Sequence, residues 1–119
     1  MPFVAASEAL THAPFPGVEG RIVHGDGMTY AYWHIPAGTE IPEHAHVHEQ
    51  FLHVVSGAID ATVDGETRRL EAGDTAVLPS HVPHGVRVVS DSHLIDVFQP
   101  ARPEYGRPQA ETDPAGRDA

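Results

Sequence analysis

The hydrophobic pattern of the chain consists of short apolar or alternating runs separated by glycine and proline, eleven of each. No segment sustains the i, i+3, i+4 spacing of an amphipathic helix, whereas several show the alternation expected of half-buried strands. The pattern predicts strands at Gly20–Val23, Met28–Ile35, Glu43–His46, Glu49–Val55, Gly57–Val63, Glu66–Glu71, Thr75–Pro79, Gly85–Val89 and His93–Phe98. We therefore expect an all-β protein.

The turns between these runs favour a sandwich or a barrel. Asp64-Gly65 separates two alternating runs, and this dipeptide is typical of a type I′ hairpin, which needs positive φ at both central residues. Many short, closely spaced strands are the signature of a closed or double-sheet architecture. At 119 residues one domain is expected. We place an N-terminal arm or strand at 1–20, the barrel at 21–105 and a flexible, polar C-terminal tail at 106–119.

The amino-acid composition limits the ligands and the catalytic mechanisms that are open to the protein. The 7 basic residues, all arginine, stand against 17 acidic ones for a net charge of −10, so no clustered positive charge is available for nucleic acid. The chain has no lysine and no cysteine, which excludes Schiff-base chemistry, thiol nucleophiles and thiolate ligands. Catalysis must come from His, Asp, Glu, Tyr, Arg or a metal ion.

No membrane segment or secretion signal is predicted. No apolar run approaches 18 residues, and the first ten residues lack a basic region followed by a long apolar stretch. We expect a cytoplasmic protein without a membrane partner.

A group of closely spaced donors stands out between Gly38 and Gly57. His44, His46 and Gln50 fall within a segment that otherwise reads as β-structure, and His84 follows in a later run. Two His at i and i+2 on an extended strand point to the same face, and imidazole is the commonest metal ligand near neutral pH. If Gln50 faces inward, alternation puts Phe51 on the opposite face. This arrangement predicts a metal site.

The two runs resemble the two motifs of the cupin superfamily. In sequence order they read Gly38-x5-His44-x-His46-x3-Gln50-x6-Gly57 and Gly73-x5-Pro79-x-His81-x2-His84. Gln50 stands where glutamate is more usual, and His81 where glycine is common. The resemblance implies the conserved cupin β-barrel, a jelly-roll-like double-stranded β-helix, in which His44, His46, Gln50 and His84 bind one divalent transition metal.

The identity of the metal stays open, because nitrogen and oxygen donors suit Ni, Zn, Fe, Mn and Co alike. Three imidazoles and one carboxamide form a neutral ligand set. A divalent ion bound there keeps its full charge and should be a stronger Lewis acid than in a carboxylate site.

Three further residues are candidates for binding or proton transfer. Asp96 lies in phase with Leu94 and Phe98, so an inward position would desolvate its carboxyl and suit it as a general acid or base. The alternatives are an exposed edge residue or an internal hydrogen-bonded carboxylate. Arg102 is either a bidentate carboxylate clamp or a solvated charge. Tyr30 is either a hydroxyl that reaches a polar ligand or a packing residue.

The segments HAHVHEQ, VPH and DVFQPARPEY together resemble the small single-domain cupins of the KdgF type. That family linearises unsaturated uronates released by pectin and alginate lyases, opening the ring to a keto acid. The resemblance implies Asp96 as the proton-transfer residue, Phe98 in the pocket wall and Arg102 on the carboxylate of a small sugar acid. It also implies a homodimer. The alternatives are a non-haem metal dioxygenase and a sugar- or acid-binding cupin without catalysis.

Overall fold

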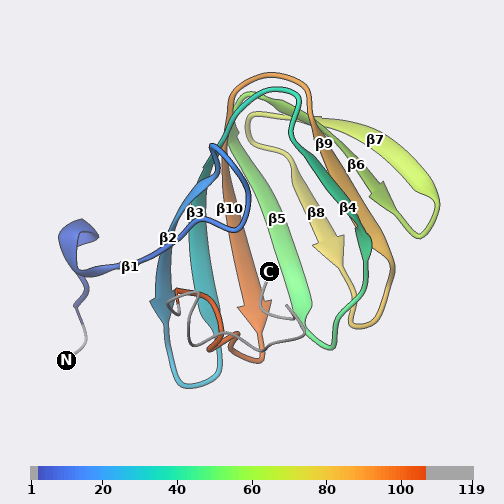
Figure 1. The fold of residues 1–119 in the computed structure, drawn as a ribbon. Coiled ribbons are helices and arrows are strands. Elements are labelled where there is room, and N and C mark those ends of the chain that lie inside the picture. Colours follow the sequence, from blue (N-terminus) through green and yellow to red (C-terminus); the bar gives the residue numbers. More distant parts are fainter. Residues whose placement is uncertain (1–2, 107–119) are drawn as a thin grey trace.

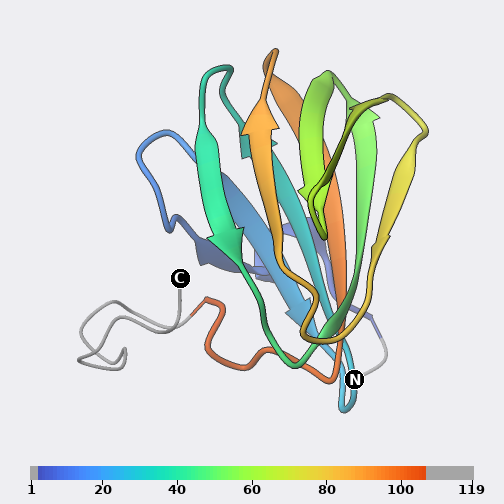
Figure 2. The same ribbon diagram turned by 90° about the vertical axis from the view of Figure 1, so that its right-hand side faces the viewer.

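The computed structural model describes residues 3–106, which form two antiparallel sheets packed face to face (Figures 1 and 2). The larger sheet has the strand order β1-β2-β3-β10-β5-β8 and the smaller one β4-β9-β6-β7. The strands are β1 Leu10–His12, β2 Glu19–His24, β3 Thr29–Ile35, β4 Glu40–His44, β5 Glu49–Ser56, β6 Ala58–Val63, β7 Glu66–Glu71, β8 Thr75–Leu78, β9 His84–Val88 and β10 Ser92–Gln99. The prediction of an all-β double-sheet fold is confirmed.

Helical structure in the described residues is limited to one 3-10 turn, Ala6–Glu8. Within that part of the chain, no helix has the length and apolar character needed to cross a membrane.

Two strands differ from the sequence pattern. The pattern misses β1, a three-residue strand that pairs with β2 at the edge of the larger sheet. β4 begins and ends earlier than predicted, because its pairing with β9 runs from Glu40 opposite Arg87 to His44 opposite His84. His46 therefore lies in the loop beyond β4 and not on the strand itself.

Alternation along the strands builds the core between the sheets. On β5, Gln50, Leu52 and Val54 are buried while Phe51 and Val55 are exposed, as predicted. The neighbouring strand β10 buries Leu94 and Phe98, and Phe98 is only 1% exposed. The inner faces of β5 and β10 thus carry apolar core residues, and the polar side chains of Gln50 and Asp96 lie among them.

Two turns depend on backbone conformations that favour particular residues. Asp64 and Gly65 both have positive φ, 49° and 82°, which confirms the predicted β6–β7 hairpin. Gly57 joins β5 to β6 at φ 92°, and a Cβ there would lie 2.3 Å from Ser92 Oγ. Gly57 therefore lets the chain turn tightly against β10.

The segment after β10 folds back over one end of the sandwich, close to β2 and β3 (Figure 1). Its attachment uses backbone groups: Arg102 N donates to Thr29 Oγ1 at 2.7 Å, and Tyr105 O lies 3.0 Å from His24 Nε2. Tyr105 is only 8% exposed and joins the core. Of the predicted tail, residues 107–119 lie outside the described residues.

Candidate metal centre

Three histidines converge at one end of the smaller sheet. His44 ends β4 and His84 begins β9, and the two residues are cross-strand partners. His46 lies two residues further on, where the loop is tied down by a hydrogen bond of 2.7 Å from His81 N to His46 O. One nitrogen from each ring lies within 4.8 Å of the other two. The loop thus places His46 beside the pair although it does not share their strands.

The hydrogen bonds of the rings indicate which nitrogens carry protons. The Nδ1 atoms of His44, His46 and His84 lie 2.9, 3.0 and 2.9 Å from the backbone carbonyls of residues 42, 48 and 82. A carbonyl only accepts, so each neutral ring must carry its proton on Nδ1. Each Nε2 then presents a lone pair, as in metal-binding histidines whose other nitrogen donates to a backbone carbonyl.

Burial keeps the rings of His46 and His84 uncharged near neutral pH, because it lowers the pKa of both. Desolvation, followed by the nearby Arg102 guanidinium and His84, lowers the pKa of His46 to about 4. Burial also lowers the pKa of His84, opposed in part by its backbone hydrogen bond. His84 Nε2 is buried and has no hydrogen-bond partner among the described residues. An unpaired buried acceptor costs free energy, and a bound cation would satisfy it.

Gln50 adds a fourth donor. Gln50 is only 6% exposed, and its Nε2 donates to Asp96 Oδ1 at 2.8 Å. Its Oε1 then lies 3.1 Å from His46 Nε2. With the His46 proton on Nδ1, two lone pairs face each other across this contact, and a cation held by both atoms would relieve the repulsion. The residues present therefore fit a divalent metal bound by His44, His46, His84 and Gln50.

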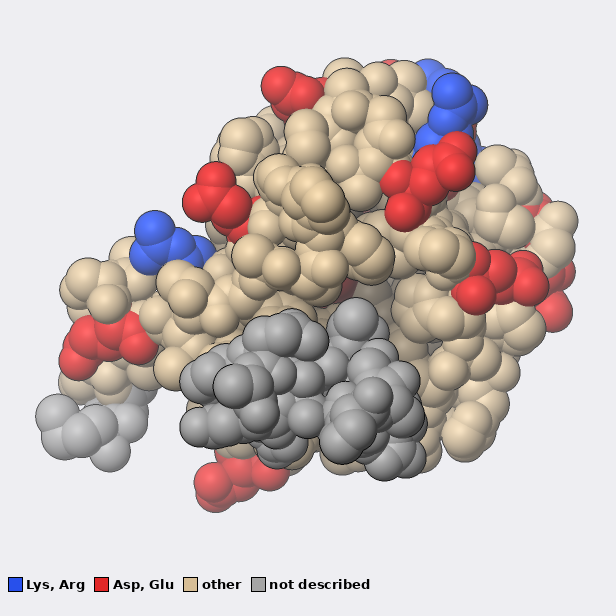
Figure 3. Space-filling model, in the orientation of Figure 1, with Lys and Arg blue, Asp and Glu red and all other residues tan. Residues whose placement is uncertain are grey.

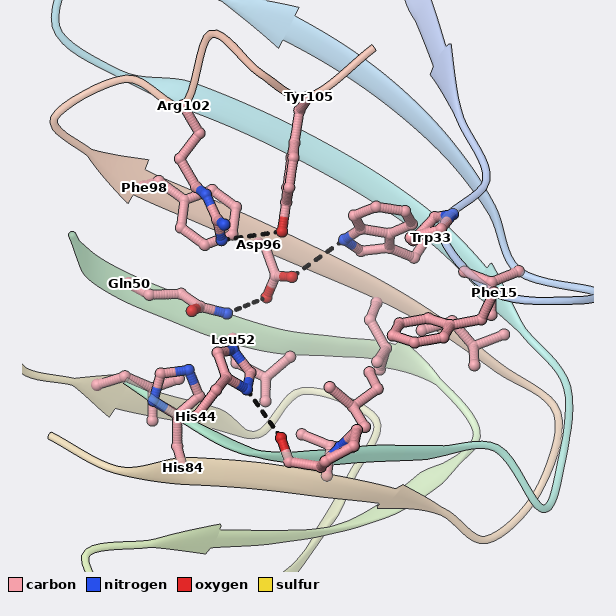
Figure 4. A pocket seen from close by; sticks show the side chains of 18 of the residues that line it. Phe15, Trp33, His44, Gln50, Leu52, His84, Asp96, Phe98, Arg102 and Tyr105 are labelled. Carbon is pink, nitrogen blue, oxygen red and sulfur yellow. Dashed lines mark hydrogen bonds between the residues drawn. The ribbon is translucent and has the colours of Figure 1, made fainter. Parts of the chain in front are cut away.

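Asp96, on β10 of the larger sheet, lies between Gln50 and Trp33 (Figure 4). Its Oδ1 accepts from Gln50, and its Oδ2 accepts from Trp33 Nε1 at 3.0 Å. Desolvation by burial raises the pKa of Asp96 to about 6, against the opposing effect of these two hydrogen bonds. The alternative of an exposed edge carboxylate is wrong, whereas the internal hydrogen-bonded carboxylate is what the structure shows.

Arg102 approaches the same space from the segment after β10. It is only 6% exposed, which rules out a solvated surface charge. Its Nη1 donates to Tyr105 Oη at 2.9 Å and its Nε to Glu104 Oε2 at 3.2 Å. The guanidinium carbon lies 4.9 Å from the centre of the Phe98 ring and 4.3 Å from that of Tyr105. Its Nη2 has no hydrogen-bond partner among the described residues.

Tyr30 does not reach this site, so the prediction that it binds substrate there is wrong. It is 39% exposed on the outer face of β3, while Ala31 and Trp33 face the interior. Both faces of β3 carry large side chains, so alternation alone could not tell which set points inward. Trp33, which is not among the predicted site residues, is the large aromatic residue of β3 that faces the interior.

Most of the candidate residues line one cavity of about 270 Å³ between the two sheets; His46 and Tyr30 are not among its lining residues. Its polar wall is formed by Glu43, His44, Gln50, His84, Asp96 and Arg102, and most of the remaining wall is apolar or aromatic. His48 lies beside this group, with its ring centre 6.0 Å from that of Phe98, and burial lowers its pKa. Acidic groups are scattered over the described part of the face drawn in Figure 3, and basic groups occupy only small areas of it.

Comparison with known proteins places the chain in a family. Residues 31–98, more than half of the sequence, match the family model for the cupin domain, and the chain belongs to this family. Among curated proteins, it is 29% identical to the pectin degradation protein KdgF of Dickeya dadantii over 92 residues, 75% of this chain and 84% of that protein. The predicted resemblance to KdgF-type small cupins is confirmed.

Solved structures give the same result. KdgF from Halomonas sp. is 33% identical with a TM-score of 0.75, covering 82% of this chain and 94% of that one. An RmlC-like cupin from Shewanella frigidimarina is 30% identical with a TM-score of 0.79, covering 86% and 93%. The likeness extends over nearly the whole length of both structures.

Proposed function

We propose that this protein is a metal-dependent enzyme that opens the ring of 4,5-unsaturated uronates to give keto acids. The observation that carries the proposal is the meeting of three kinds of group around one cavity: the metal donors, of which His44, His84 and Gln50 line it, the partly buried carboxyl of Asp96 and the buried guanidinium of Arg102. The likeness to two KdgF proteins, one of them described as a pectin degradation protein, supports the substrate class.

Arg102 would bind the carboxylate of the substrate. Its Nη2 and the second hydrogen of Nη1 form the end of the guanidinium that the internal hydrogen bonds leave available. Two parallel N–H groups match a carboxylate, and a charge-assisted pair of this kind fixes orientation as well as position. The rings of Phe98 and Tyr105 both contact the guanidinium and help to hold it in place. The sugar ring would thereby be directed toward Asp96.

Ring opening is an isomerisation, so it needs no second reactant. The bond between C1 and the ring oxygen breaks, the C1 hydroxyl becomes an aldehyde, C5 becomes a ketone, and one proton moves from the hydroxyl to C4. Asp96 would carry that proton, since each carboxylate oxygen keeps a lone pair beyond its hydrogen bond to Trp33 or Gln50. The metal, when bound, supplies Lewis acidity through a charge that its neutral ligands leave intact.

The size of the cavity supports a single sugar unit. Its volume of about 270 Å³ lies just below the roughly 300–1,000 Å³ of sites for drug-sized ligands. A monosaccharide fits this space better than an oligosaccharide. The proposed substrate is therefore the unsaturated monomer left at the end of polysaccharide breakdown.

The test follows the ultraviolet absorbance of an unsaturated uronate freshly made by a lyase. Purified metal-loaded protein should accelerate its loss, and a chelator should return the rate to the spontaneous one. Asp96→Asn at saturating metal should remove the acceleration, while Tyr30→Phe, on the outer face, should keep it. Decay at the spontaneous rate with metal-loaded protein would refute the proposal, and consumption of dioxygen by a small organic substrate would instead indicate a dioxygenase.

We also propose that two copies pair through the outer face of the larger sheet. A row of apolar side chains crosses that face in register, from Tyr30 through Val97 and Phe51 to Val77. Phe51 and Val77 are 48% and 57% exposed, which is unfavourable for a continuous apolar row in water. Sedimentation should give the mass of a dimer, and Phe51→Glu should give a monomer. A monomeric wild-type protein at micromolar concentration would exclude this pairing.

A further inference from the structure

A line of three contacts leads from the larger sheet to the metal donors, and Figure 4 draws the two that Asp96 makes. Trp33 Nε1 on β3 lies 3.0 Å from Asp96 on β10, Asp96 lies 2.8 Å from Gln50 on β5, and Gln50 lies 3.1 Å from His46 in the loop. Trp33 is 5% exposed and is the only tryptophan of the chain. It provides no metal donor, yet its N–H is the first link of this line.

The middle link determines which atom of Gln50 faces the histidines. A carboxamide can present either its oxygen or its nitrogen, and only the oxygen can ligate a metal. The Asp96 carboxylate accepts but does not donate, so the amide nitrogen must face it. Gln50 Oε1 is thereby turned toward His46 Nε2. Asp96 thus selects the ligating orientation of a side chain that has no preference of its own.

The first link fixes the carboxylate. Trp33 holds Asp96 Oδ2, which leaves Oδ1 directed at Gln50. Without the indole N–H, Oδ2 of this partly buried carboxylate would lose its donor. The carboxylate would then turn to find another donor, and Gln50 would lose its fixed partner.

The larger sheet is built to hold the indole in this place. Gly20 on β2 is the cross-strand partner of Trp33, and a Cβ at Gly20 would lie 2.4 Å from Trp33 Cζ3. The absence of a side chain at Gly20 leaves room for the ring over β2. Tyr105 packs edge-on against it, with ring centres 5.8 Å apart and planes at 84°. These contacts fix the direction of the N–H.

We propose that Trp33 is a positioning residue of the metal centre: its indole N–H fixes Asp96, which in turn directs the oxygen of Gln50 at the bound ion. The inference rests on the metal site of the proposed function and not on the identity of the substrate. It is therefore tested by metal affinity in the absence of substrate, and failure of uronate turnover in the wild-type protein would leave it standing.

The single tryptophan allows a test that changes one atom of the side chain. In a tryptophan-requiring host, benzothienylalanine can replace tryptophan, substituting sulfur for the N–H while keeping the shape of the ring. Zn²⁺ affinity, measured by competition with a chelating dye, should fall about 10- to 100-fold, as is typical when the outer hydrogen bonds of a metal site are lost. Tyr32→Phe, the adjacent residue on β3, is the matched control and should leave the affinity unchanged.

A double-substitution cycle separates positioning from a merely structural role. Asp96→Asn alone should also weaken Zn²⁺ binding, because an asparagine can accept from only one of its two neighbours. Combined with the sulfur analogue, it should cause little further loss, since Trp33 acts through Asp96. Losses that multiply would overturn the proposal, as would unchanged affinity in a folded analogue protein. If the analogue protein does not fold, Trp33→Phe takes its place in the same cycle with the same expectations.

Discussion

The raised pKa of Asp96 predicts a specific change in how stability depends on pH. The native protein raises the pKa of this carboxyl from 3.8 to about 6 through burial. Between these two values the unfolded chain is ionised while the native state still holds the proton. Stability therefore falls as pH rises through this range and levels off above the native pKa. Each pKa unit corresponds to about 1.4 kcal/mol, so the carboxyl costs about 3 kcal/mol above pH 6.

Asp96→Asn removes this pH-dependent cost and adds a fixed one. An asparagine places an N–H against either Trp33 Nε1 or Gln50 Nε2, which leaves one buried donor unsatisfied at about 1–3 kcal/mol. At pH 4 the variant should be less stable than the wild type by about this amount. At pH 8 the two should be nearly equal, or the variant slightly more stable, because the removed cost of about 3 kcal/mol offsets the lost hydrogen bond.

The assay is urea unfolding of both proteins at pH 4, 6 and 8 with a chelator present, followed by far-ultraviolet circular dichroism. The histidines titrate in both proteins, so their contribution largely cancels in the difference between the two free energies of unfolding. That difference should change by about 3 kcal/mol between pH 4 and pH 8 in favour of the variant. A difference that does not vary with pH would show that the Asp96 carboxyl is not desolvated in the native state.

Four further outcomes are expected. Removing the metal with a chelator should abolish uronate turnover, and one equivalent of divalent ion should restore it; turnover that persists in metal-free protein would contradict the site. Arg102→Lys should raise KM for the uronate about 10-fold or more, because a lysine cannot present two parallel N–H groups; an unchanged KM would remove Arg102 from substrate binding. Tyr30→Phe should leave kcat and KM unchanged, and a loss of activity would restore Tyr30 to the site. Gly57→Ala should lower the free energy of unfolding by more than about 1 kcal/mol, since its φ is 92° and Ser92 is in the way; Gly65→Ala, at φ 82° with open space, is the control and should lose less.

Much of the fold follows from patterns that are local in the sequence. Alternation on β5 predicts correctly that Phe51 faces outward if Gln50 faces inward, because a half-buried strand has only two faces. The Asp64-Gly65 hairpin follows from the backbone conformation that such a turn requires. The edge strand β1 escapes prediction, because three residues that are mostly exposed carry no alternation to detect.

The site is less accessible to such reasoning, because its geometry comes from segments distant in sequence. The His motif identifies the donors, but β4 ends at His44, so His46 owes its position to the loop and not to strand alternation. The role of Trp33 depends on Asp96, 63 positions away, and on the missing Cβ at Gly20. The one available signal was that Trp33 lies in phase with Ala31 and Ile35, the small and apolar members of its strand.

The proposed function requires three imidazoles and one carboxamide to share a single divalent ion. The most direct measurement is the anomalous scattering of a crystal grown with one equivalent of Ni²⁺ or Zn²⁺. We expect one peak per chain, in contact with Nε2 of His44, His46 and His84 and with Oε1 of Gln50. A peak at other residues, or a carboxamide turned to face the ion with its nitrogen, would contradict this expectation.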